Sequence, residues 1–390
     1  MEIPPLPALP AQQLAPWART VVAVAGDVLP ESSWLGAQDR AHFLDGVRQE
    51  FSGADLVFVN LEEPITRSGK VTPYKKPAEL ADGRDYILRA RHRAIPQSLK
   101  DAGVGLVGLA NNHMLDYTAA GLRDTLRAFA ESHLPVVGAG LKPQAEQAFV
   151  FEKNGCRVAL LAFSDVVPRN SWATEKQLGI ASAKDPQNLA RAIRRARRQA
   201  DFVVLMIHWG GQGKHRITPR QRQLAQVAAE AGCDVVVGMH PHVLQGIEHV
   251  GRVPVFYSVG NFAFAGSKPG YDECVLVKLI FAARELAAVE LVPVEIDPRG
   301  APKVVTEASA AKILDHVDGY CRMFNTQVKE GRLEPGPVRQ ALVYDLSEQR
   351  GRSRTAKVRR AGPLKSHPAR GSGPAPGTGS GAAPGGGTKN

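Results

Sequence analysis

Short apolar runs alternate with amphipathic segments along most of this chain. The runs that predict strands cover residues 20–25, 55–60, 104–110, 202–207, 234–237 and 253–258. Segments with apolar residues at helical spacing lie between them, at residues 95–102, 119–132, 186–200 and 219–231. Strands that alternate with helices in this way predict an α/β domain that contains parallel strands.

A hairpin signal interrupts this parallel pattern. The apolar runs 149–151 and 157–163 flank Lys153-Asn154-Gly155, and Asn-Gly between apolar runs is the strongest short signal for a β-hairpin. Two further β runs, 273–281 and 288–295, precede a terminal helical region at about 307–330. The sheets are therefore expected to be mixed rather than purely parallel.

The alternating pattern predicts one large domain at residues 20–335. Residues 1–19 are rich in Pro and Ala and are expected to form an extended leader. Residues 336–390 form a basic tail, which from about residue 350 has too little apolar surface to fold and is predicted to be disordered. The stretch 65–85 shows no period and is expected to be a loop over the functional site.

The net charge of +11 is concentrated in the tail. Residues 350–390 hold nine Lys or Arg and no acidic residue, which leaves only +2 for the rest of the chain. A nearly neutral domain argues against nucleic-acid binding, with the tail as the one segment through which it could occur. No run reaches the ~18 apolar residues of a transmembrane segment, and no signal peptide is visible, so we expect a cytoplasmic protein.

Side chains that can bind metals stand at or just after the ends of the predicted strands. Carboxylates can hold two cations close together, and imidazole or amide groups can complete the coordination. Strand ends converge at one edge of an α/β sheet, where we expect these side chains to meet. The spacing of His240-Pro241-His242 predicts two imidazoles on one face, because positions i and i+2 of an extended segment share a face. The candidate ligands are Asp27, Glu62, Asn112, His208, His240 and His242.

Any one of these residues alone would more often be structural. Asp27 alone could cap a helix, and Asn111-Asn112 alone could form a turn. A single histidine after a strand is usually an ordinary surface or core residue. The prediction of a metal site therefore depends on the whole set.

Six motifs, in order, make the chain similar to the CapA family of bacterial capsule and poly-γ-glutamate synthesis proteins. They are Gly26-Asp27, Asn60-Leu61-Glu62, Ala110-Asn111-Asn112-His113 with Asp116, His208-Trp209-Gly210, Gly238-Met239-His240-Pro241-His242-Val243 and Ser258-Val259-Gly260-Asn261-Phe262. The similarity runs from about residue 20 to about residue 265. It implies the calcineurin-like metallophosphoesterase fold, a four-layer αββα sandwich of two mixed β-sheets between helices.

The resemblance also implies how the candidate ligands divide between two cations. One cation would be held by Asn112, His208 and His240. The other would be held by Asp27 and His242, and Glu62 would bridge the two.

Further residues take roles around this centre by the same resemblance. His113 matches a histidine that protonates a leaving group or steadies the transition state, and Asp116 is close enough in sequence to orient it. Arg89 falls where CapA-like chains often carry an aromatic-x-Arg string, so its guanidinium could hold a substrate carboxylate or phosphate. Asn261 is expected on the substrate side, where it would organise the loop beside the metals. Lys75-Lys76 could contribute to substrate binding as Arg89 does.

The chain departs from the broad phosphoesterase pattern at two positions. Many of those enzymes have Asp-x-His where this chain has Asp27-Val28-Leu29, so one imidazole of the first metal site is missing. Glu62 stands where they have a bridging Asp. CapA-like proteins share both features, which favours that branch without implying phosphatase activity.

Two functions of different classes follow as expectations. The first is a metal-dependent hydrolase that uses a metal-activated water on a phosphoester or a γ-glutamyl-type amide of an anionic small molecule or polyglutamate-like substrate. It would use two divalent cations, of Mn, Fe or Zn rather than Ca, because the ligands mix nitrogen and oxygen. The second is a non-catalytic accessory protein that binds a polymer-synthesising ligase of the polyglutamate type or its polyanionic product.

Overall fold

The computed structural model describes residues 19–31, 42–83, 85–264, 270–282, 285–324, 326–329 and 331–335. The predicted leader, except Arg19, and the predicted basic tail lie outside the described residues. The chain divides into two units, Met1–Arg339 and Gln340–Asn390, and every described residue belongs to the first.

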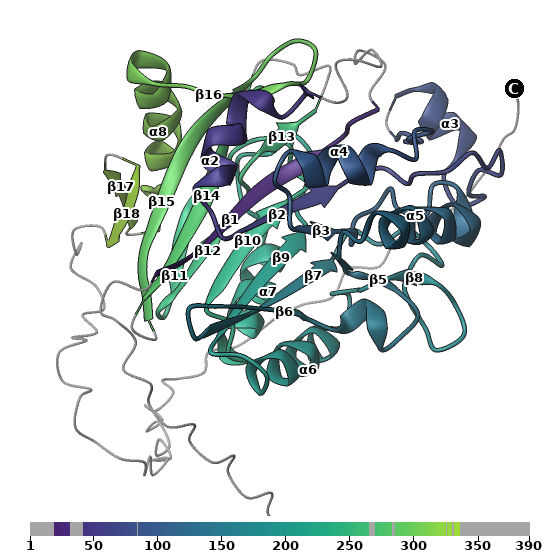
Figure 1. The fold of residues 1–390 in the computed structure, drawn as a ribbon, viewed down its shortest axis with the longest axis horizontal. Coiled ribbons are helices and arrows are strands. Elements are labelled where there is room, and N and C mark those ends of the chain that lie inside the picture. Colours follow the sequence, from purple (N-terminus) through teal and green to yellow (C-terminus); the bar gives the residue numbers. More distant parts are fainter. Residues whose placement is uncertain are drawn as a thin grey trace, which may run out of the picture. The chain divides into compact units, whose positions relative to one another are not determined.

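Two mixed sheets form the centre of this unit (Figure 1). The larger contains β1 (Arg19–Val28), β2 (Leu56–Leu61), β3 (Leu106–Gly108), β4 (Val136–Val137), β13 (Asn261–Ala263), β14 (Glu273–Ala282), β15 (Glu285–Ile296), β16 (Pro302–Val304), β17 (Thr326–Lys329) and β18 (Arg332–Pro335). Its order is β17-β18-β15-β14-β1-β2-β3-β4, with β13 also paired to β1 and β16 to β15. The strands from β1 to β4 are parallel, whereas β14 and β15 are antiparallel to their neighbours.

The smaller sheet contains β6 (Phe149–Lys153), β7 (Cys156–Ser164), β9 (Phe202–His208), β10 (Val235–Met239), β11 (Ile247–Val250) and β12 (Val253–Phe256). Its order is β11-β12-β10-β9-β7-β6. The strands β7, β9, β10 and β12 are parallel, and the predicted Asn-Gly hairpin is the antiparallel pair β6–β7. A separate pair joins β5 (Ala139–Gly140) to β8 (Gly179–Ile180).

Helices lie beside both sheets. The segments near the larger sheet are η1 (Asp45–Val47), α2 (Arg48–Ser52), α3 (Pro77–Ala81), α4 (Ile95–Asp101) and α5 (Thr118–Ser132). The helices near the smaller sheet are α6 (Pro186–Arg197) and α7 (Pro219–Glu230), and the short segment η2 (Gln144–Glu146) contacts β5 and β7. Helix α8 (Glu307–Cys321) contacts β11, β15 and β17.

Three hydrophobic cores separate four layers. Successive strand residues point to opposite faces, so Ala23 packs with Phe129 of α5 while Val22 packs in the core shared by the two sheets, together with Val204. On the outer face of the smaller sheet, Val203 belongs to the core under α6 and α7. The order helix, sheet, sheet, helix confirms the predicted αββα sandwich.

Two predicted elements differ from the structure. The helical region predicted at 307–330 ends at Cys321, and the hairpin β17–β18 follows it. Gly331 has a φ of +75°, a conformation that glycine adopts without the cost paid by other residues, at the turn of this hairpin. The stretch 65–85 contains the short helix α3, which begins at Pro77, where a missing N–H costs nothing.

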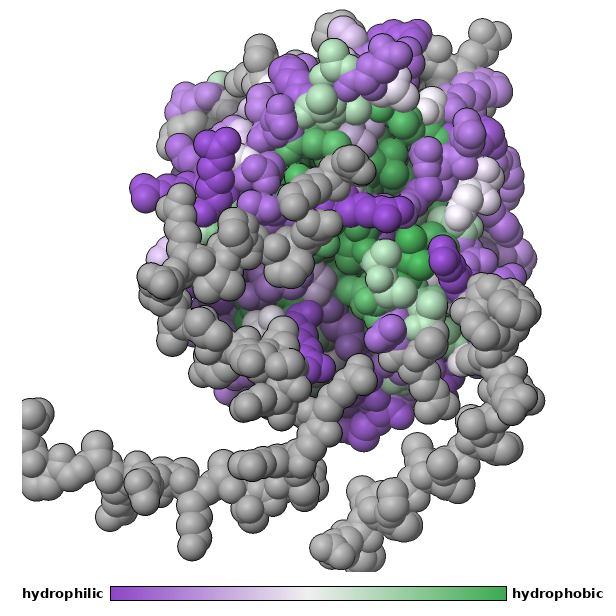
Figure 2. Space-filling view, turned by 90° about the vertical axis from the view of Figure 1, so that its left-hand side faces the viewer, coloured by the Kyte–Doolittle hydropathy of each residue, from purple (hydrophilic) through white to green (hydrophobic). Residues whose placement is uncertain are grey.

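Apolar surface is unevenly distributed over the molecule. On the face drawn in Figure 2, hydrophobic residues gather in the middle and hydrophilic residues lie around them. The exposed large apolar side chains include Tyr74, Tyr86 and Trp172, which stand outside the named helices and strands. No helix in the described part of the chain is long and apolar enough to cross a membrane.

Strands β1 and β13 approach too closely to admit a side chain at Gly26, where a Cβ would lie 2.2 Å from the carbonyl oxygen of Gly260. Gly26→Ala is therefore expected to push the two strands apart and destabilise the fold by about 1–3 kcal/mol. Thermal unfolding measures this loss. Gly69→Ala is the control, because a Cβ there would meet nothing within 4 Å. Equal melting temperatures for the two variants would contradict the prediction.

Candidate metal centre

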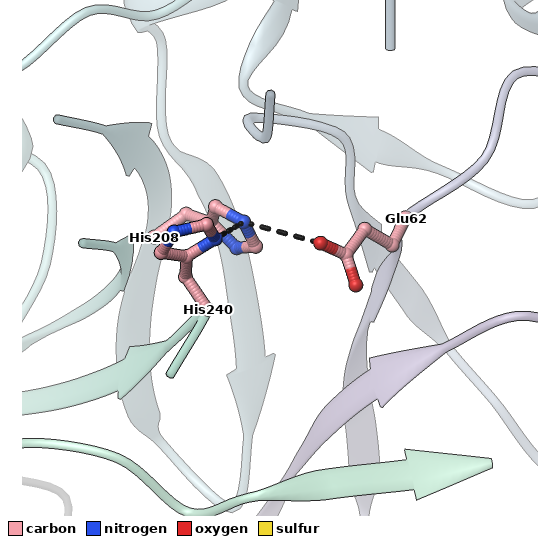
Figure 3. A group of neighbouring side chains, drawn as sticks. All are labelled: Glu62, His208 and His240. Atoms are coloured by element: carbon pink, nitrogen blue, oxygen red, sulfur yellow. Dashed lines mark hydrogen bonds and ion pairs between the residues drawn. The ribbon is translucent and has the colours of Figure 1, made fainter. Parts of the chain in front are cut away.

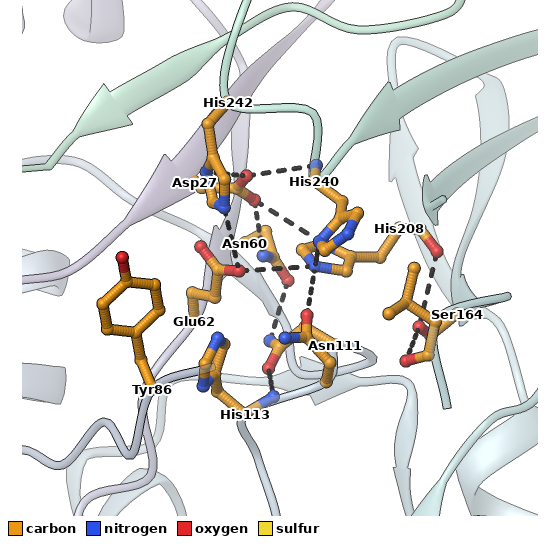
Figure 4. A network of polar contacts seen from close by, with 12 residues as sticks. Asp27, Asn60, Glu62, Tyr86, Asn111, His113, Ser164, His208, His240 and His242 are labelled. Atoms are coloured by element: carbon orange, nitrogen blue, oxygen red, sulfur yellow. Dashed lines mark hydrogen bonds and ion pairs between the residues drawn. The ribbon is translucent and has the colours of Figure 1, made fainter. Parts of the chain in front are cut away.

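The six predicted ligands gather where parallel strands of both sheets end. Figure 4 shows five of them close together: Asp27, Glu62, His208, His240 and His242. The larger sheet supplies three: Asp27 lies next to the last residue of β1, Glu62 follows β2, and Asn112 follows β3. The smaller sheet supplies the histidines: His208 is the last residue of β9, and His240 and His242 follow β10. All six side chains are buried, with exposures from 0% to 9%. The site therefore lies between the two sheets, at the end where these strands finish.

One group of atoms surrounds the Nε2 atom of His208. This nitrogen lies 3.0 Å from His240 Nδ1, 2.8 Å from Asn112 Oδ1 and 3.3 Å from Glu62 Oε1. Figure 3 shows the two imidazoles side by side with the Glu62 carboxylate facing them. Glu62, His208 and His240 each offer a ligand atom, and these atoms all lie within 4.8 Å of one another. This spacing suits one cation.

A second group faces the same carboxylate. Asp27 Oδ2 lies 3.5 Å from His242 Nδ1, and His242 Nε2 lies 3.7 Å from Glu62 Oε1. The ligand atoms of Asp27, Glu62 and His242 also lie within 4.8 Å of one another. Glu62 thus belongs to both groups, as a carboxylate between two cations must.

The polar atoms of this site fit bound cations. Glu62 is fully buried, yet neither of its carboxylate oxygens has a hydrogen-bond partner, and His208 Nδ1 also has none. A buried polar atom without a partner costs about 1–3 kcal/mol, and more when it is charged. Native proteins contain few such atoms, and a bound ion is one way to satisfy them. The donor set and its unmet hydrogen-bonding capacity therefore both fit divalent metals.

A shell of asparagines orients the candidate ligands. Asn60 Nδ2 donates to Asp27 Oδ1 at 2.7 Å, and Asn111 Nδ2 contacts Asn60 Oδ1 at 3.2 Å. Asn261 Oδ1 lies 2.8 Å from His242 Nδ1, so a proton on Nδ1 would leave the Nε2 of His242 free toward Glu62. Partners of this kind fix the orientation of ligands at metal sites. The sequence interpretation gave no role to Asn60 or Asn111, although both stand inside the quoted motifs.

The reason predicted for the meeting of His240 and His242 is wrong. The segment is not extended, because His240 has a φ of +93° and His242 a φ of +59°. These two left-handed residues flank Pro241 and bring the ring centroids to 5.7 Å. Positive φ in residues other than glycine costs about 1–3 kcal/mol and persists where surrounding structure enforces it, often at functional sites.

Burial opposes negative charge on both carboxylates. Burial, followed by repulsion from Glu62, raises the pKa of Asp27 to about 6. Burial also acts to raise the pKa of Glu62, but the imidazoles of His242 and His208 outweigh it and hold that pKa below its ordinary value. Without metal, Asp27 is therefore the carboxyl group that takes up a proton first as the pH falls.

Metal binding is expected to weaken as the pH falls through about 6. A cation must displace the proton from Asp27, whose pKa is about 6, and this competition grows about tenfold per pH unit below that value. Calorimetric titration with Mn²⁺ across the range from about pH 5 to 8 measures the slope. Asp27→Asn, which lacks the titrating group, should bind weakly at every pH. An affinity for the wild type that stays constant across the range would refute the prediction.

His113 and Asp116 form a buried pair beside this cluster. His113 Nδ1 lies 2.8 Å from Asp116 Oδ2, and the backbone N–H of Leu88 donates to the same oxygen at 2.8 Å. The backbone N–H of His113 donates to Asn111 Oδ1 at 3.1 Å. Figure 4 places the His113 ring next to Glu62. This position is suited to a proton donor at the edge of the centre.

The residues predicted to bind substrate have different surroundings. The guanidinium of Arg89 donates to the carbonyl of Ser68 at 2.8 Å and lies 4.5 Å from the centre of the Tyr117 ring. Lys76 is exposed, whereas the side chain of Lys75 is only 3% exposed. Arg89 therefore stiffens the 65–90 segment, and Lys75 faces inward.

The two mixed sheets between helices, with candidate ligands at the strand ends, give the chain the architecture of the calcineurin-like metallophosphoesterases. The chain belongs to the family described as bacterial capsule synthesis protein PGA_cap, whose model matches residues 21–266. This result confirms the resemblance drawn from the six motifs.

Two curated relatives and one solved structure illustrate the similarity. The capsule biosynthesis protein CapA of Bacillus anthracis is 35% identical over 269 residues, which cover 66% of this chain and 65% of the relative. The PGA biosynthesis protein CapA of Bacillus subtilis is 32% identical, over 73% of this chain and 72% of the relative. A Staphylococcus aureus structure described as a 5'-nucleotidase is 13% identical, with a TM-score of 0.42, over 77% of this chain and 58% of that chain. The fold assignment rests on the strand order described above.

Proposed function

We propose that this PGA_cap protein is a metal-dependent hydrolase. The observation that carries the proposal is the Glu62 carboxylate, which is fully buried, has no hydrogen-bond partner and is shared by two groups of ligand atoms. A carboxylate in this position is expected between two cations. The mixture of imidazole, carboxylate and amide donors favours Mn, Fe or Zn over Ca.

Two such cations would lower the pKa of a bound water and polarise the group under attack. The other tasks fall to the chain's own residues. Asn60 and Asn261 orient Asp27 and His242 toward Glu62. His113 is paired with Asp116 through Nδ1, which leaves its Nε2 to hold or give a proton at the leaving group.

The substrate is proposed to be an anionic phosphoester or a γ-glutamyl-type amide. The names of the two relatives support the second class, because one is a capsule biosynthesis protein and the other a PGA biosynthesis protein. A phosphoester is supported by the ligand set, because paired cations can clamp the attacking and leaving oxygens of a displacement at phosphorus.

The test is hydrolysis of both substrate classes by purified protein loaded with Mn, Fe or Zn. p-Nitrophenyl phosphate, γ-glutamyl p-nitroanilide and poly-γ-glutamate are suitable probes. We expect turnover of one class that EDTA abolishes and added metal restores. His208→Ala and Asp27→Ala should remove it, and His249→Ala, which alters a histidine on β11 away from both ligand groups, should not. Unchanged activity in the first two variants would eliminate the proposal.

Leu29 favours a second candidate function of another class. It stands where many phosphoesterases have an additional imidazole, and its apolar side chain is buried. With fewer ligands for one cation, the protein would act as an accessory that binds a polyglutamate-type synthase or its polyanionic product. Copurification of a synthase or polymer with metal-free but functional protein would select this alternative.

A further inference from the structure

Lys75 extends from the loop before α3 into contact with the His113–Asp116 pair. Its Nζ atom lies 2.8 Å from Asp116 Oδ1 and 3.2 Å from Asp85 Oδ1, and it also donates to the carbonyl oxygen of Tyr86. An ammonium group has three N–H donors and no acceptor. The Tyr86 carbonyl accepts a hydrogen bond from it, and the two carboxylates form ion pairs with it.

This arrangement determines what His113 can do with its Nδ1 atom. That atom lies 3.1 Å from Lys75 Nζ and 2.8 Å from Asp116 Oδ2. The Asp116 carboxylate can only accept a hydrogen bond, so a proton on His113 Nδ1 is donated to Asp116 Oδ2, whereas the Lys75 ammonium can only donate to that nitrogen. Lys75 holds one oxygen of Asp116 and thereby turns the other toward the imidazole.

The same ammonium connects the pair to residues 85 and 86. It contacts both Asp85 and the Tyr86 carbonyl. The side chain of Tyr86 is half exposed, and Figure 4 shows its ring beside Glu62 and His113. One buried cation thus contacts both the His113–Asp116 pair and the backbone of a residue whose side chain is half exposed.

We propose that Lys75 is a positioning residue for His113. It fixes the Asp116 carboxylate that His113 Nδ1 contacts, so that the imidazole keeps one orientation, and it keeps the 85–88 segment next to the ring. The kinetic consequence rests on the proposed hydrolase function, whereas the arrangement of the imidazole does not.

A purely structural role makes a different prediction. Buried ion pairs often contribute little net stability, because desolvation of the charges offsets their attraction. A folded variant that lacks the charge of Lys75 would then keep its activity. A positioning residue instead lowers kcat while substrate binding and metal content remain.

The first experiment compares neighbouring lysines. Lys75→Met removes the ammonium and keeps most of the side-chain stem, and it is expected to lower kcat about 10- to 100-fold. KM should stay within about twofold of the wild type, and metal content should be unchanged. Lys75→Arg should restore part of kcat. Lys76→Met, which removes an exposed charge paired with Glu79, should behave as wild type. Wild-type kcat in Lys75→Met would overturn the proposal.

The second experiment asks whether Lys75 acts through Asp116. In an Asp116→Asn background, adding Lys75→Met should cause little further loss of kcat, because the link is already broken. Full multiplication of the two separate losses would contradict the proposal. The double variant carries neither buried charge, so it keeps the test available if Lys75→Met alone leaves Asp116 unpaired and unfolds.

A third measurement does not depend on hydrolase activity. Long-range ¹H–¹⁵N correlation spectra of metal-free protein show whether the His113 ring occupies one environment or several, with His113→Gln to assign the signals. We expect one sharp set of ring signals in the wild type and broadened or doubled signals in Lys75→Met, because the imidazole is no longer held in one orientation. Identical spectra would overturn the proposal. A wild type without hydrolase activity but with this difference would contradict the proposed function and leave the positioning role supported.

Discussion

Glu62→Gln is expected to lower kcat by about 10³-fold, because the loss of a shared ligand removes several kcal/mol of metal-dependent stabilisation and each ~1.4 kcal/mol is tenfold in rate. Glutamine keeps the shape of the side chain but loses the charge and one ligand oxygen. Metal content, measured by plasma mass spectrometry on the dialysed protein, should fall with the rate.

Glu63→Gln is the matched control for this experiment. Glu63 is the next residue, is also buried, and belongs to neither ligand group. Burial raises its pKa to about 8, so it is largely a neutral acid at neutral pH and glutamine imitates it closely. Wild-type activity and metal content in Glu62→Gln, or an equal loss in Glu63→Gln, would contradict the assignment of Glu62.

Divalent metal is expected to raise the melting temperature of the wild type by about 10 °C. A cation at about 1,000 times its Kd stabilises the folded state by about 4 kcal/mol for each site. For a domain of about 300 residues, an unfolding entropy of about 2.1 cal/mol/K per residue makes each kcal/mol worth about 1.5 °C, so two sites together give about 10 °C. Calorimetry with Mn²⁺, and again after EDTA, measures the shift.

The size of this shift should follow the ligand set. Glu63→Gln is expected to show the full effect, whereas Glu62→Gln and His208→Ala should lose most of it. A shift of the same size in all four proteins would mean that metal stabilises the fold from a place other than this centre.

The fold could be predicted largely because each core strand carries a local pattern. Strands β1, β9 and β10 are apolar runs, and Asp27, His208 and His240 lie at or next to their ends. Both the strands and these polar residues can therefore be recognised in the sequence. The hairpin β6–β7 follows from Asn154-Gly155 for the same reason. These features depend on neighbouring residues, which the sequence shows directly.

The parts that escaped prediction depend on contacts between distant residues. The positive φ values of His240 and His242 are imposed by the packing around them, and no pattern of residue types predicts them. From the sequence, Lys75 is a residue of a loop. Its burial depends on its ion pair with Asp116, which lies 41 positions later in the chain. The hairpin after α8 is not predicted, because Thr326 and Val328 fit the spacing of a helix as well as that of a strand.

The most direct test of the account is an anomalous difference map from crystals grown with Mn²⁺. The account predicts two peaks, one beside His208 and His240 and the other beside Asp27 and His242, with the Glu62 carboxylate between them. A map without a peak among these residues, at a metal concentration that saturates the thermal shift, would contradict the claim that they form a metal centre.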